Sequence, residues 1–159
     1  MPPGESFVIK RILVPLDGSE LSASVQPFAL ELAKPLGASI VLFHTVIEPV
    51  LTYPGVEAMN LDSGALEEMK TGARKFLASA ASDLAAKGVK ADTVVNIGNA
   101  TDGIVWAAER ENAGLIVMST HGRSGIGRAV LGSVADAVVR RTSLPVVLVR
   151  PRHEKEGGA

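Results

Sequence analysis

The sequence predicts an α/β fold in which a single doubly wound, five-stranded parallel sheet forms a Rossmann-like nucleotide-binding domain. Short and almost continuous apolar runs alternate with longer segments whose apolar residues recur at helical spacing. Such runs are typical of parallel strands buried under helices on both faces. The length of 159 residues fits one domain, which we expect over 1–150, followed by a disordered polar tail over 151–159.

Five segments have strand character because they are rich in aliphatic and β-branched residues and are bounded by turn or cap signals. The first ends at Asp17-Gly18-Ser19, and the third alternates more, as a strand at or near the edge would. In chain order they are 7–16, 38–47, 89–98, 113–120 and 144–150.

Four helices connect these strands and imply right-handed crossovers. They are predicted over 21–37, from 62 or 63 to 88, over 100–112 and over 132–142. Pro27 predicts a kink or a later start in the first of them, because proline removes a backbone donor. Trp106 lies on an apolar helical face and is predicted to belong to the core. Residues 48–62 lack a clear period and are predicted to form a loop placed to cover a site.

Composition excludes several classes of function. The chain has 16 basic and 17 acidic residues, so its charge favours neither nucleic acid nor an acidic membrane surface. It has no cysteine, which rules out disulfides and thiolate chemistry and fits a cytoplasmic location. The N-terminal stretch "MPPGESFVIKR" has no apolar core of signal-peptide length, and no apolar run is long enough to span a bilayer, so we expect neither a signal peptide nor a membrane span.

Two segments are suited to hold a ligand, because doubly wound sheets bind ligands beyond the carboxyl ends of their strands. "VPLDGS" (14–19) places Asp17 at such an end, and "STHGRSGIGRAVLGS" (119–133) follows the fourth strand. Its glycines let backbone amides approach an anion, and Ser133 adds a hydroxyl where the next helix begins. Arg123 and Arg128 are either phosphate contacts or solvated surface residues.

Familiar motifs do not explain this loop. A P-loop needs lysine and a hydroxyl residue where "GRSGIGRA" (122–129) has Arg128 and Ala129, and a dinucleotide fingerprint needs glycine where Val130 stands. Asp17, His121 and Ser133 are not predicted to form a hydrolase triad, because no Gly-x-Ser-x-Gly elbow surrounds the serine. We therefore predict no catalytic residue and no protein metal site.

Nine residues separate Gly122 from Gly132-Ser133. This spacing resembles the motif of the ATP-binding branch of the universal stress protein family, which is Gly-x-x-Gly, nine residues, then Gly-Ser/Thr. Ser119 stands at the first motif glycine. The resemblance covers almost the whole chain, including "RILVPLDGSELS", "LFHTV" and "LPVVLVR". It implies ATP with Mg²⁺ or Mn²⁺, and adenine bound by main-chain groups of Thr45. The implied nucleotide-binding residues are Pro15, Asp17, Thr45, Met118, Ser119, Gly122, Gly132, Ser133 and Val134.

The resemblance also implies a homodimer paired through the strand at 144–150, which would lie at the sheet edge in the order 3-2-1-4-5. An apolar edge strand is a liability unless it is paired. The resulting hypothesis is an ATP-binding stress-response protein that acts as a nucleotide-dependent regulator or sensor. The alternatives are a slow ATPase or autophosphorylating protein, a nucleotide-free dimeric interaction module, and a cyclic AMP binder. No particular protein partner is predicted.

Overall fold

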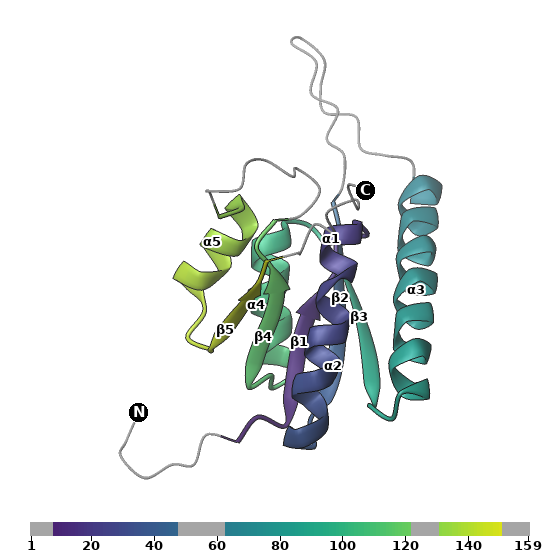
Figure 1. Cartoon of the computed structure of the whole chain (residues 1–159). Helices are drawn as coiled ribbons and strands as arrows, with labels where there is room; N and C mark the ends of the chain where they lie inside the picture. Colours follow the sequence, from purple (N-terminus) through teal and green to yellow (C-terminus); the bar gives the residue numbers. More distant parts are fainter. Residues whose placement is uncertain (1–7, 48–62, 122–130, 151–159) are drawn as a thin grey trace, which may run out of the picture.

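A computed structural model describes residues 8–47, 63–121 and 131–150. These residues form a parallel sheet of five strands in the order β3-β2-β1-β4-β5, as predicted. Helices lie on both faces of the sheet (Figure 1). The strands are β1 (Arg11–Pro15), β2 (Ser39–Val46), β3 (Ala91–Ile97), β4 (Leu115–Ser119) and β5 (Val146–Val149). The helices are α1 (Glu20–Ala23), α2 (Val25–Leu36), α3 (Ser63–Ala86), α4 (Ala100–Arg110) and α5 (Ser133–Arg141).

The first predicted helix is two helices, α1 and α2, joined at Ser24. Pro27 is the third residue of α2, and the interruption at Ser24 agrees with the prediction of a kink or a later start. An amide in the first turn of a helix has no intrahelical acceptor, so the missing donor costs little there. Gly37 closes α2 at a φ of 60°, in the left-handed region.

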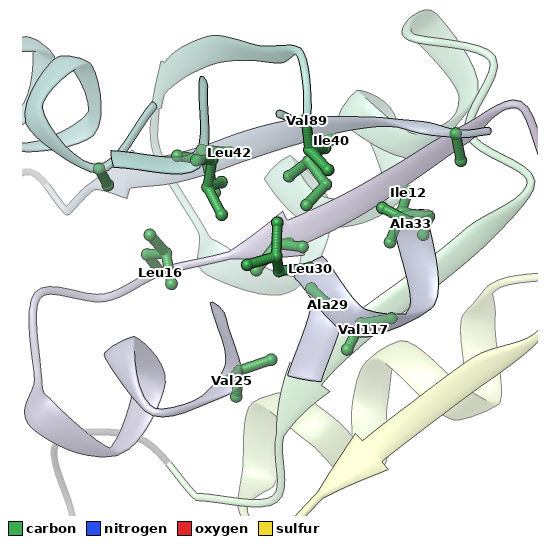
Figure 2. Close-up of a cluster of buried hydrophobic side chains, with 14 of the residues drawn as sticks. Ile12, Leu16, Val25, Ala29, Leu30, Ala33, Ile40, Leu42, Val89 and Val117 are labelled. Atoms are coloured by element: carbon green, nitrogen blue, oxygen red, sulfur yellow. The ribbon is translucent and has the colours of Figure 1, made fainter. Parts of the chain in front are cut away.

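Two apolar cores hold the layers together, one on each face of the sheet. On one face, α2 and α3 pack on side chains of β1, β2 and β4, and Figure 2 shows part of this cluster, including Val25, Leu30 and Leu42. On the other face, α4 and α5 cover Leu13 and Phe43. Alternate residues of each strand enter opposite cores, as the two-residue period of a strand requires.

The structure contradicts the prediction that Trp106 belongs to the core. Its side chain is 39% exposed, and the Arg110 guanidinium lies 4.9 Å from the centre of its ring. The buried face of α4 instead carries Gly103, Ile104 and Ala107. These mostly small residues bring the helix axis close to the sheet, and a ring at position 106 points away from that face. Within the described residues, no helix is long and apolar enough to cross a membrane.

Candidate functional site

A cavity of about 590 Å³ lies at the carboxyl edge of the sheet. The last residues of three adjacent strands line it, namely Pro15 of β1, Val46 of β2 and Ser119 of β4. The first residues of α5, one side of α3, and Ala100 and Ile104 of α4 also line it. The cavity therefore occupies the place where doubly wound sheets bind their ligands.

The structure brings the predicted nucleotide-binding residues together wherever it describes them. Gly122, Arg123 and Arg128 lie outside the described residues, so their predicted roles stay predictions. The other predicted residues all line the one cavity: Pro15, Asp17, Thr45, Met118, Ser119, Gly132, Ser133 and Val134.

The turn from β1 into α1 is built around Asp17. Its Oδ1 accepts hydrogen bonds from the backbone amide of Ser19 at 2.9 Å and from the Ser19 hydroxyl at 2.5 Å. Ser19 in turn caps α1, because its Oγ accepts from the amide of Ser22 at 3.1 Å. Gly18 has a φ of 85°, a conformation that glycine adopts without strain. Asp17 thus shapes the helix entry while it lines the cavity.

The start of α5 is held close to the end of β4. The amide of Gly132 donates to the Thr120 carbonyl at 2.8 Å, and a Cβ at position 132 would lie 2.8 Å from that same oxygen. Glycine is therefore needed for this approach. The first helical bond of α5 runs from Asp136 to Gly132, so the amides of residues 133–135 have no intrahelical acceptor. They give this edge of the cavity a partial positive charge.

The α3 wall is apolar, and our sequence analysis missed it. Met69, Ala73 and Phe76 line the cavity from this helix, together with Gly72. The helical period predicted that α3 has a buried face but not what lies opposite it. Gly72, a glycine inside a long helical pattern, was the available signal.

His44 joins the α3 wall to the β1 turn. Its Nδ1 lies 2.7 Å from the Leu16 carbonyl oxygen and carries the proton in this pair, because a carbonyl oxygen only accepts. The His44 ring meets Phe76 edge-on, with the ring centres 6.3 Å apart. The histidine thus fixes the position of two elements of the cavity wall.

Residues 9–150 match the Universal stress protein family. The chain belongs to this family. It is 34% identical over 147 residues to the universal stress protein MJ0531 of Methanocaldococcus jannaschii, covering 91% of this chain and 85% of the relative.

Two solved structures of the family share the fold. One is the universal stress protein from Archaeoglobus fulgidus in complex with dAMP, with a TM-score of 0.64 and 22% identity, covering 89% of this chain and 98% of that one. The other is a universal stress protein in complex with cAMP, with a TM-score of 0.62 and 22% identity, covering 89% and 97% of the two chains.

Ser119, at the first glycine of the family's ATP-binding motif, keeps an ordinary strand conformation. Among the described non-glycine residues only Asn112 has a positive φ, so serine at position 119 is not strained. Ser119 is 7% exposed, and its hydroxyl donates to the His121 carbonyl at 2.7 Å. The hydroxyl proton of Ser119 is therefore used in a hydrogen bond that stabilises the turn after β4. Its oxygen keeps a lone pair for another donor.

Proposed function

We propose that this universal stress protein binds an adenine nucleotide, with ATP as the expected ligand, and acts as a nucleotide-dependent regulator or sensor. The observation that carries the proposal is the convergence of the described motif residues on one cavity at the carboxyl edge of the sheet. Two structures of the same fold hold dAMP and cAMP, which supports adenine nucleotides as the ligand class.

The phosphates would lie at the start of α5. The amides of residues 133–135, which have no intrahelical acceptor, and the hydroxyl of Ser133 offer several donors to one anion there. Charge-assisted hydrogen bonds contribute about 1.5–3 kcal/mol each, so a few of them are enough to hold a polyphosphate. The base would lie toward β2, against main-chain groups of Thr45.

The cavity walls fit a nucleotide that brings its own metal ion. Asp17 is the acidic residue among those lining the cavity, and the described residues contain no group of three metal-ligating side chains. A Mg²⁺ or Mn²⁺ ion would therefore be held mainly by phosphate oxygens, with Asp17 as the nearby carboxylate. The ion would compensate the charge of the phosphates.

Calorimetric titration with ATP, AMP and cAMP, with and without Mg²⁺, tests this proposal. We expect Ser133→Ala to weaken ATP binding about tenfold, the value of one lost charge-assisted hydrogen bond. Ser143→Ala, an exposed serine beyond the other end of α5, is the matched control and should bind as the wild type does. A folded wild-type protein that binds none of the three nucleotides contradicts the proposal.

Slow hydrolysis is tested separately with Asp17→Asn, which keeps an acceptor oxygen for the Ser19 hydrogen bonds. Phosphate release that this change abolishes, while ATP binding persists, would establish an ATPase role for Asp17. Release at an unchanged rate in both Asp17→Asn and Ser133→Ala would identify a contaminating enzyme.

We also propose that two copies pair through β5. This strand is at the edge of the sheet next to β4, and its residues are half-buried within one copy. An apolar edge of this kind is protected when it pairs. Val147→Lys should shift the mass measured by light scattering from dimer toward monomer. An unchanged dimer mass in a variant with native circular dichroism would refute the pairing.

A further inference from the structure

Three residues of α3 form a row along the edge of the cavity. Met69, Gly72 and Phe76 are spaced i, i+3, i+7, so they lie on one side of the helix, and all three line the cavity. The neighbouring row, which holds the helix on the sheet, is buried: Ala73, Leu77, Ala80 and Leu84. Gly72 is thus a gap in the wall between two large side chains.

Packing among the described residues does not explain this glycine. A Cβ built at Gly72 meets no atom within 4 Å, and its φ is not in the left-handed region. Glycine inside a helix is less favourable than any residue except proline. Glycine at position 72 therefore lowers helix stability without improving the packing of the described residues. A bound ligand that occupies the space beside Gly72 would explain why a glycine stands there.

The chemistry of this part of the cavity fits a flat apolar group. Met69 is 39% exposed and offers a polarisable thioether, which packs well on aromatic rings. Phe76 is already packed edge-on against His44. The described part of α3 contributes no polar side chain to the cavity, and the polar lining residues, including His44 beside Phe76, come from other elements: Asp17, Ser22, His44, Thr45, Ser119, Thr120 and Ser133. A ligand with one flat apolar end and one anionic end matches this division.

We propose that Gly72 is a specificity-determining position, where the missing side chain lets the nucleobase lie against the backbone of α3 beside Met69. This inference rests on the proposed nucleotide binding and adds a size limit to it. The α3 wall admits a planar base only while position 72 has no side chain. A methyl group there narrows the space, and a larger side chain closes it.

The test is a size series at position 72 with matched controls at Thr71, an exposed neighbour on α3 that does not line the cavity. Gly72→Ala and Gly72→Leu are compared with Thr71→Ala and Thr71→Leu. Affinity for ATP and AMP is measured by calorimetry, and the melting temperature by calorimetric scanning. Because alanine and leucine are better helix formers than glycine, we expect both Gly72 variants to melt about 3 °C higher than the wild type.

Binding should move in the opposite direction. We expect Gly72→Ala to weaken both nucleotides about threefold and Gly72→Leu more than about tenfold, as overpacking of a filled site does. The Thr71 variants should bind as the wild type does. Loss of affinity in a protein that has become more stable cannot come from unfolding, so this pair of results would support the inference.

Other results would overturn it. If both Gly72 variants bind ATP as the wild type does, nucleotide binding stands but the base does not lie against α3. If both Gly72 variants melt at a lower temperature than the wild type while their affinity for ATP is unchanged, the glycine is required for packing within the protein. If the wild type binds neither ATP nor AMP, the proposed function fails together with this inference.

Discussion

Helices α3 and α4 cover opposite faces of β2, and Gly72 of α3 and Gly103 of α4 have different surroundings. A Cβ at Gly103 of α4 would lie 2.7 Å from the Thr45 hydroxyl oxygen and 3.0 Å from the Phe43 ring. A Cβ at Gly72 of α3 would meet no described atom. Glycine costs a helix about 1 kcal/mol relative to alanine in both places. Packing against the sheet explains Gly103, whereas open space at the cavity distinguishes Gly72.

The difference follows from how each helix is held. The buried face of α4 consists mostly of small residues, so its backbone lies close to the sheet, and Asp102 forms an ion pair with Arg141 of α5. The described part of α3 is held by Leu77 and Leu84 toward its C-terminal end, while residues 69–76 in its middle border the cavity. Both helices line the cavity, α4 through Ala100 and Ile104, but they differ at their glycines. Gly103 of α4 is packed against the sheet, whereas Gly72 of α3 lines the cavity with open space beside it.

The largest expected effect is at Gly103. Gly103→Leu should lower the free energy of unfolding by about 3 kcal/mol, because a side chain there overlaps Thr45 and Phe43. Chemical denaturation measures this change, with Gly72→Leu as the control that should not destabilise the protein. Equal stability of the two variants would remove the distinction between the helices.

The next effect concerns Gly132, a glycine that is both packed and part of the cavity. Gly132→Ala should cost about 2 kcal/mol of stability, because its Cβ would overlap a backbone oxygen that cannot rotate away. It should also weaken ATP binding, since the start of α5 must move. Denaturation and calorimetry on the same sample test both. A variant with wild-type stability would show that the Thr120–Gly132 approach is not tight in solution.

A smaller effect of opposite sign is expected at Thr45. Its Oγ1 is buried without a hydrogen-bond partner among the described residues. Thr45→Val keeps the shape and removes this hydroxyl, so it should stabilise the protein by about 1 kcal/mol. ATP affinity should not change if only main-chain groups of Thr45 bind the base. A loss of affinity would assign the hydroxyl to the ligand, and a loss of stability would reveal a partner for it.

The smallest effect is at the surface of α3. A hydrogen bond from Lys70 to Glu67, and then the charge of Lys70, lower the pKa of the Glu67 carboxyl. A lowered pKa in the folded state gives stability that is present above the unfolded pKa and is lost as the pH falls through the folded pKa. Glu67→Gln should therefore lower the melting temperature by less than about 1 °C at pH 7.

That difference should disappear as the pH falls through the lowered pKa of Glu67, because the wild-type carboxyl is then protonated as well. Melting curves of the two proteins at pH 7 and pH 3 measure it. A difference that persists at the lower pH would show that the side chain, rather than its charge, supports the N-terminal part of α3.

Local patterns were sufficient for much of the fold. The strands and helices were predicted because burial on a sheet or a helix leaves a period of 2 or 3.6 in the sequence. The joint near Pro27 was predicted because proline acts on its own helix turn. Trp106 was predicted wrongly for the same reason, since its apolar character is local while its exposure depends on how closely the small residues bring α4 to the sheet.

The sequence by itself determined the order of elements and the motif residues, because hydrophobic period and glycine spacing are properties of neighbouring positions. Only the tertiary structure decided which elements enclose the cavity, that α3 supplies its apolar wall, and that Gly103 is packed while Gly72 is open. The space beside a residue is set by atoms far away along the chain. Such space leaves no period in the sequence, and it becomes visible only when the helices are placed on the sheet.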